Sequence, residues 1–131
     1  MQENSTVIKS ILIIEDDMFI GEMYVSSLKK AGYDVDWVTT GTTGYSMAIA
    51  RQYDLILLDI MLPEKQGGDV LNLLRNDSVD NIPNSRVIIL TNFDQDEKIR
   101  ANQEAKVDGY LIKADITPHR LIEIVQQLKK Q

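Results

Sequence analysis

The 131-residue sequence has no cysteine, which removes several classes of function at once. The chain cannot form a disulfide framework, use a thiol nucleophile or build a zinc–thiolate site. This absence suits a reducing compartment, and we predict a cytoplasmic location. The apolar runs are too short to cross a bilayer, and the first six residues lack the features of a signal peptide, so no membrane contact is expected.

Aromatic residues are also scarce, at 6% of the chain, whereas hydrophobic residues make up 44%. This balance suits an aliphatic core, and the chain is long enough to bury one without metals or disulfides. Asp and Glu (20) outnumber Lys and Arg (14), giving a formal net charge of −6 and a pI near 4.7. We therefore predict no direct contact with nucleic acid. We expect a flexible N-terminal segment, residues 1–8, and a single domain, residues 9–131.

Short apolar segments alternate along the chain with segments of helical character. The predicted strands cover residues 10–14, 33–38, 53–59, 86–90 and 108–112. Helices are predicted between the strands and after the last one, ending near residues 30 and 51, covering 69–75, and starting near 94 and 117. This alternation predicts a single doubly wound α/β fold, with five parallel strands and helices on both faces of the sheet.

The third predicted strand ends in a carboxylate. Four apolar residues, 55–58, run without interruption into Asp59, a pattern typical of a strand buried on both faces. Ligands bind at the carboxyl edge of open α/β sheets. The position of Asp59 is therefore predicted to be functional.

Polar residues also end three other predicted strands. Glu15, Asp16 and Asp17 follow the first strand, Thr91 ends the fourth, and Lys113 follows the fifth. If these ends lie side by side, they form one pocket with the carboxylate of the third strand. Clustered carboxylates without histidine or cysteine favour Mg²⁺ over zinc. A carboxylate beside Mg²⁺, a lysine and a hydroxyl is suited to accept a phosphoryl group as an aspartyl phosphate.

Four motifs, in a fixed order along the chain, resemble those of a known protein family. They are Ile14-Glu15-Asp16-Asp17, then Leu58-Asp59-Ile60-Met61-Leu62-Pro63 followed by Gly67, then Thr91, and finally Tyr110-Leu111-Ile112-Lys113. From Lys9 onward the chain resembles the receiver domain of two-component response regulators. The resemblance implies a flavodoxin-like sheet in the order 2-1-3-4-5. It also implies a signalling phosphoacceptor that assists its own phosphorylation and dephosphorylation, rather than an enzyme.

The resemblance further implies a phosphoacceptor and a metal site. Asp59 would accept the phosphoryl group. Asp16 and Asp59 would bind Mg²⁺ directly, Glu15 would bind it through water, and Met61 would bind it through its backbone carbonyl. Asp17 is not equivalent to a ligand in this family, despite its charge.

The remaining roles concern catalysis, switching and partners. Thr91 would move its hydroxyl toward the phosphoryl group, Lys113 would pair with that group, and Tyr110 would change between exposed and buried positions. The phosphodonor would be a histidine kinase or a phosphotransfer protein. A shift of the last helices and strand would then signal to a downstream protein, to an output domain, or through a phosphorylation-linked dimer.

The sequence departs from the family pattern at two positions. Ala114 stands where a proline in a cis bond usually follows the lysine, and a cis bond to a non-proline residue costs about 2.5–4 kcal/mol. We therefore expect the loop 113–117 to be remodelled or trans. Asn92 replaces the small residue that usually follows the threonine, and we predict that it narrows access to the phosphoryl group.

Two other classes of function remain open at this point. A pseudo-receiver would keep the fold as a protein-interaction module without taking phosphate; the intact site residues count against it, while Ala114 and Asn92 leave it open. A phosphatase with an aspartyl nucleophile commonly needs a second aspartate two residues further on, where this chain has Met61. A flavin-binding domain is disfavoured, because acids replace the phosphate-cradling loop after the first strand.

Overall fold

The computed structural model describes residues 7–62, 67–76, 78–92 and 106–129. Its strands form one five-stranded parallel sheet in the order β2-β1-β3-β4-β5. This confirms the predicted fold class and strand order. The strands are β1 (Ser10–Ile14), β2 (Asp34–Val38), β3 (Leu55–Asp59), β4 (Arg86–Thr91) and β5 (Gly109–Ile112).

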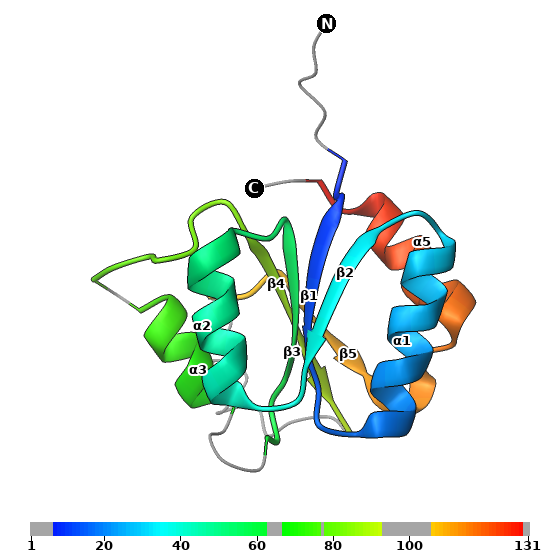
Figure 1. Ribbon diagram of the computed structural model, residues 1–131, viewed down its shortest axis with the longest axis horizontal. Coiled ribbons are helices and arrows are strands. Elements are labelled where there is room, and N and C mark those ends of the chain that lie inside the picture. The colour runs from blue at the N-terminus through cyan, green and yellow to red at the C-terminus, as the bar shows by residue number, and fades with distance from the viewer. Residues whose placement is uncertain (1–6, 63–66, 77, 93–105, 130–131) are drawn as a thin grey trace, which may run out of the picture.

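Helices cover both faces of this sheet (Figure 1). On one face lie α1 (Met18–Lys30) and α5 (Pro118–Gln127), and on the other lie α2 (Gly41–Arg51) and α3 (Gly67–Leu74). A 3-10 turn, η1 (Lys113–Asp115), follows β5. The helix predicted to start near residue 94 lies outside the described residues. Within the described ranges, no helix is both long and apolar enough to cross a membrane.

Side-chain caps set the starts of α1 and α5. The Asp17 carboxylate accepts the Ile20 N–H at 3.0 Å and so caps α1. Thr117 caps α5 in the same way, with Pro118 as its first residue. Because the Asp17 side chain caps α1, it points to the start of that helix. The two acids before it, Glu15 and Asp16, lie at the carboxyl edge of the sheet.

The core consists of two apolar layers, one on each face of the sheet. Successive residues of β1, β3 and β4 alternate between these layers, so these strands are buried on both sides, as their unbroken apolar runs predicted. The layer under α2 and α3 contains Leu12, Ile14, Ile56, Leu58, Val87 and Ile89. The layer under α1 and α5 contains Ile11, Ile13, Leu55, Leu57, Ile88 and Leu90.

Two residues that precede β1 already make contacts with the rest of the domain. Ile8 is buried in the layer under α1 and α5, and Val7 forms an antiparallel bridge with Lys129. Both residues belong to the N-terminal segment that was expected to be flexible. The division of the chain into residues 1–8 and 9–131 stays a prediction.

A buried arginine joins two loops at the far end of the sheet. Arg75 follows α3, and its Nη2 donates to the carbonyls of Ile82 and Ser85, both at 2.9 Å. Its Nη1 donates to the carbonyl of Lys106 at 2.9 Å, and its Nε pairs with Asp80 at 3.1 Å. Arg75 therefore connects the α3–β4 loop to the segment that leads into β5.

Candidate functional site

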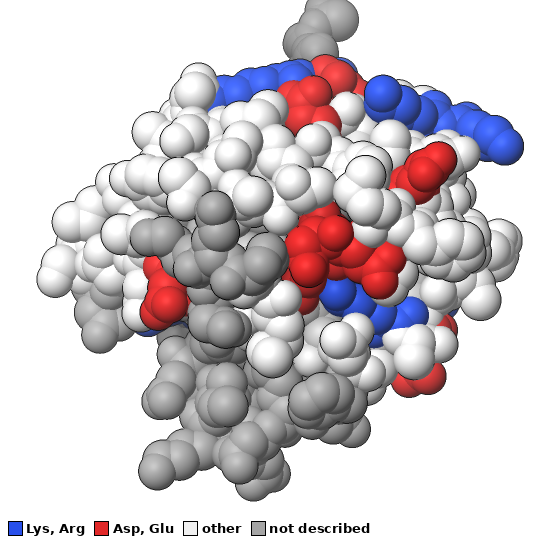
Figure 2. Space-filling model, turned by 60° about the horizontal axis from the view of Figure 1, so that its bottom comes forward, with Lys and Arg blue, Asp and Glu red and all other residues white. Residues whose placement is uncertain are grey.

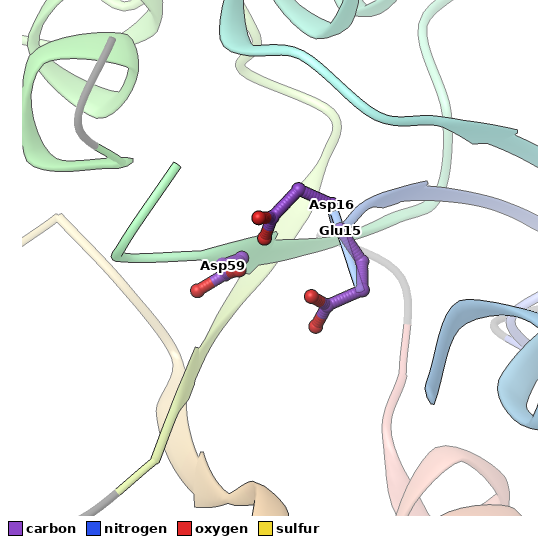
Figure 3. A group of neighbouring side chains, drawn as sticks. All are labelled: Glu15, Asp16 and Asp59. Atoms are coloured by element: carbon purple, nitrogen blue, oxygen red, sulfur yellow. The ribbon is translucent and has the colours of Figure 1, made fainter. Parts of the chain in front are cut away.

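Three carboxylates meet at the carboxyl edge of the sheet. Glu15 and Asp16 follow β1, and Asp59 ends β3, whose Leu58 pairs with Ile14. One carboxylate oxygen from each acid lies within 4.8 Å of the others (Figure 3). Glu15 and Asp59 are buried, whereas Asp16 is exposed. Figure 2 shows acidic groups gathered where the strands end, with basic groups beside them.

Lys113 provides a buried counter-charge for two of these acids. Its Nζ lies 2.7 Å from Glu15 Oε1 and 3.0 Å from Asp59 Oδ2, and its side chain is only 5% exposed. Burial acts to lower the pKa of Lys113, but the two carboxylates raise it above its ordinary value. Lys113 is therefore a charged ammonium at neutral pH.

Asp59 is held in its ionised form by its neighbours. Its Oδ1 accepts the Met61 N–H at 2.9 Å, while its other oxygen faces Lys113. Burial acts to raise the pKa of Asp59, but the Met61 N–H, the Asp16 carboxyl and Lys113 together hold it below its ordinary value. The carboxylate at the end of β3 is thus available as a nucleophile.

The other two acids hold their charge less easily. Burial raises the pKa of Glu15 to about 7, although Lys113 and the Asp17 N–H, which donates to Glu15 Oε2 at 3.0 Å, act against this rise. Burial and the neighbouring Asp59 also raise the pKa of Asp16. Among the described residues, one lysine, Lys113, lies against this cluster of three carboxylates and contacts two of them, so these groups together carry excess negative charge. An all-oxygen ligand set with excess negative charge fits Mg²⁺.

Two further predicted residues lie on the neighbouring strands. Thr91 ends β4, is buried, and pairs in register with Ile112, directly before Lys113. Tyr110 is half-buried in β5 and packs against the layer under α2 and α3. The structure thus places Thr91 at the carboxyl edge of the sheet and Tyr110 three residues before Lys113, while the switching role of Tyr110 stays a prediction.

The comparisons with known proteins agree with this geometry. Residues 11–126 match the family described as the response regulator receiver domain. The chain belongs to the response regulator receiver family. This confirms the family resemblance drawn from the four motifs of the receiver sequence.

Curated relatives of this receiver include two bacterial regulators. It is 40% identical over 103 residues to the probable transcriptional regulatory protein SilR of Salmonella typhimurium, covering 79% of this chain and 43% of SilR. It is 36% identical over 119 residues to the transcriptional regulatory protein QseB of Escherichia coli O157:H7, covering 91% of this chain and 51% of QseB. The receiver therefore spans about half the length of the curated relatives that it matches.

Solved structures show the same fold. A CheY-like response regulator receiver domain protein from Methanospirillum hungatei JF-1 superimposes on this receiver with a TM-score of 0.77 and 28% identity. The match covers 92% of each chain. The five-stranded receiver architecture therefore extends over nearly the whole chain.

The two departures from the family pattern lie beside the receiver's acidic cluster. No cis peptide bond occurs in the described residues, so Lys113–Ala114 is trans, and Ala114 is exposed within η1. This agrees with the expected trans loop. Asn92 is exposed directly after Thr91. Its effect on access to a phosphoryl group stays a prediction.

Sequence reasoning missed two contacts of the receiver site. It assigned Lys113 to a future phosphoryl group, but not to Glu15. It also assigned no partner to Trp37, whose indole N–H donates to the carbonyl of Glu15 at 2.9 Å. A lone aromatic residue near the end of a predicted strand was the one available signal, and it does not identify a partner.

The raised pKa of Glu15 predicts how receiver stability depends on pH. In metal-free buffer, we expect Glu15 to make the free energy of unfolding fall as the pH rises from about 4.5 to about 7. Over this range the folded protein holds a proton on Glu15 that the unfolded chain has released. The contribution is complete below the ordinary pKa of 4.5 and is lost as the pH passes about 7.

Urea denaturation at several pH values, with a chelator present, measures this dependence. Glu15→Gln cannot ionise, so it should show a smaller fall over the same pH range than the parent protein. An equal fall in both proteins would contradict the assignment to Glu15.

Proposed function

We propose that this receiver accepts a phosphoryl group on Asp59 from a histidine kinase or a phosphotransfer protein in a Mg²⁺-dependent reaction. The arrangement around Asp59 carries the proposal. This carboxylate is buried and ionised, lies 3.0 Å from the Lys113 ammonium, and belongs to a cluster of three acids. These are the groups that phosphoryl transfer to a carboxylate needs.

Each residue of the site has a defined part in this proposal. One oxygen of Asp59 attacks phosphorus, and a new O–P bond forms as the bond from phosphorus to the donor breaks. The Met61 N–H and Lys113 hold the carboxylate in a fixed orientation for this attack. Glu15, Asp16, Asp59 and the Met61 carbonyl would hold Mg²⁺. When bound, Mg²⁺ neutralises charge on the transferring phosphoryl oxygens.

The signal would follow from a change of partners at the sheet edge. Phosphorylation adds a charge of roughly −1.5 to −2. In the proposal, Lys113 and the Thr91 hydroxyl turn to the new oxygens, and Tyr110 moves with β5. The displaced surface of β5 and α5 then acts on a downstream protein, on an output domain, or on a second receiver in a phosphorylation-linked dimer.

Labelling with acetyl phosphate and Mg²⁺ tests the proposed acceptor. Mass spectrometry should find one phosphoryl group on the parent protein and none on Asp59→Asn. Asp36→Asn is a matched control, because Asp36 pairs with Arg51 on the surface, away from the acids. It should be labelled like the parent, and a chelator should prevent labelling of both. Equal labelling of Asp59→Asn would refute the assignment.

A pseudo-receiver that takes no phosphate is not favoured. The acidic cluster and its lysine are intact, and the family match covers the whole site. The expectations of a cytoplasmic location and of no direct nucleic-acid contact stay predictions for these residues. The second expectation does not extend to a longer regulator, because SilR and QseB are named transcriptional regulatory proteins.

Asn92 is proposed to limit the approach of water to the phosphorylated site. We expect Asn92→Ala to lose the phosphoryl group about twofold to tenfold faster, because a smaller side chain leaves more room for water. The decay of labelled protein after removal of acetyl phosphate measures this rate. Asn84→Ala, an exposed residue in the α3–β4 loop, should decay like the parent. Equal rates of phosphoryl loss in Asn92→Ala and the parent would contradict the role proposed for Asn92.

A further inference from the structure

The single tryptophan of the chain contacts the acidic loop directly. Trp37 lies in β2 and is half-buried, and its indole N–H donates to the carbonyl of Glu15 at 2.9 Å. Glu15 lies one residue beyond the end of β1. The last residue pair between β1 and β2 is Ile14 with Val38. The Trp37 side chain therefore adds a contact between β2 and the residue that follows β1.

This hydrogen bond completes the attachment of the Glu15 backbone to β2. The Glu15 N–H donates to the carbonyl of Val38 at 3.1 Å, and its carbonyl accepts from Trp37. The peptide unit between Glu15 and Asp16 contains that carbonyl, so the indole restrains its rotation. A rotation of this unit would move the Asp16 carboxylate relative to Asp59.

The position of the indole depends on a glycine in α1. A Cβ placed on Gly21 would lie 2.3 Å from Cζ2 and 2.4 Å from Cε2 of Trp37, far closer than carbon atoms approach. Gly21 belongs to the first turns of α1, and its N–H donates to the carbonyl of Asp17 at 2.8 Å. The ring is thus confined between α1 and the loop that carries the acids.

We propose that Trp37 is a positioning residue that orients the Glu15–Asp16 peptide for divalent-cation binding. Its indole emission then reports whether the carboxylate cluster holds a cation. This inference rests on the proposed function, because it takes the three acids as the Mg²⁺ site. It adds a residue of β2, outside the set of acids, to the machinery of that site.

Calorimetric titration of the whole chain with Mg²⁺ tests the proposal. Trp37→Phe keeps an aromatic ring but removes the N–H donor, and it should bind Mg²⁺ about twofold to tenfold more weakly, as expected for the loss of one hydrogen bond. Gly21→Ala keeps the donor but displaces the ring, and it should weaken binding in the same direction. If either variant fails to fold, the other still provides the comparison.

Val35→Ala is the matched control for a loss of packing in β2. Val35 is buried in the same apolar layer and pairs with Ile11, far from the acids along the strand. It should lower stability without changing the affinity for Mg²⁺. Equal weakening by Val35→Ala would mean that Trp37 acts only through general stability and would overturn the proposal.

The emission of the parent protein gives a readout that needs no variant. Because Trp37 is the only tryptophan, the indole signal comes from this position alone. The emission should change with the same midpoint as the calorimetric titration, because a divalent charge arrives next to the peptide that accepts the indole N–H. An unchanged emission at saturating Mg²⁺ would overturn the proposal.

Failure of this inference can be separated from failure of the proposed function. If the parent binds Mg²⁺ and is labelled on Asp59 while Trp37→Phe binds Mg²⁺ equally well, only the role of Trp37 is refuted. If the parent does not bind Mg²⁺, both proposals are refuted.

Discussion

Replacement of Lys113 by methionine is expected to lower the free energy of unfolding by about 3–5 kcal/mol in metal-free buffer at neutral pH. The substitution leaves two buried carboxylates, Glu15 and Asp59, without the ammonium that lies 2.7 Å and 3.0 Å from them. Removing one partner of a buried ion pair costs more than the pair contributed, because the remaining charge stays out of water. Urea denaturation of the parent and the variant measures the difference.

Two conditions should reduce the loss in Lys113→Met. Saturating Mg²⁺ would supply another positive charge, and a pH near 5 would let Glu15 take up a proton, since its pKa is about 7. Lys29→Met, at an exposed position of α1, serves as the control and should change stability by no more than about 0.5 kcal/mol. Similar losses in the two variants would contradict the role assigned to Lys113.

Replacement of Arg75 by methionine is expected to cost about 3–5 kcal/mol as well, for a different reason. Arg75 as a whole is 9% exposed, and its guanidinium donates to the carbonyls of Ile82, Ser85 and Lys106. Methionine fills a similar volume but donates nothing, so three carbonyls would lose a donor in a largely buried place. Thermal and urea denaturation should both show this loss of stability. The hydrogen bonds of Arg75 hold the α3–β4 loop to the segment that leads into β5, so both segments lose an attachment in the variant.

Arg51→Met provides a matched control for the arginine. Arg51 also forms two ion pairs, with Asp34 and Asp36, but its side chain is 42% exposed. Exposed ion pairs contribute about 0–1 kcal/mol, so this substitution should have a small effect. Unlike the loss in Lys113→Met, the loss in Arg75→Met should be insensitive to Mg²⁺. Equal effects of the two arginine substitutions would show that burial of Arg75 does not set its contribution.

Most of the sheet could be predicted from local patterns. The runs at residues 10–14 and 86–90 are apolar on both faces and bounded by polar residues, and they became central strands with nearly the same bounds. Most other bounds lie within one residue of the prediction, but two elements start two residues away from it. The third strand begins at Leu55 and not at Tyr53, because the Asp54 side chain accepts the N–H groups of Lys9 and Ser10. The helix predicted from residue 69 begins at Gly67.

The acidic cluster was predictable because its members end neighbouring parallel strands. The contacts that fix these acids were not. The Trp37–Glu15 bond joins residues 22 apart in sequence, and the bond from Arg75 to Lys106 joins residues 31 apart. Hydrophobic periodicity records which side of an element is buried, but it does not record which polar group a buried donor will meet. The pairing of Lys113 with Glu15 was unpredictable for the same reason.

The bridge between Val7 and Lys129 also affects how the protein can be handled. It brings the two ends of the described chain together at the end of the sheet opposite the carboxyl edge, where the acids lie (Figure 1). A label or a fused protein attached at either end would therefore stand away from the carboxyl edge of the sheet. Because the ends are adjacent, a short linker could join them and new termini could be opened in a surface loop.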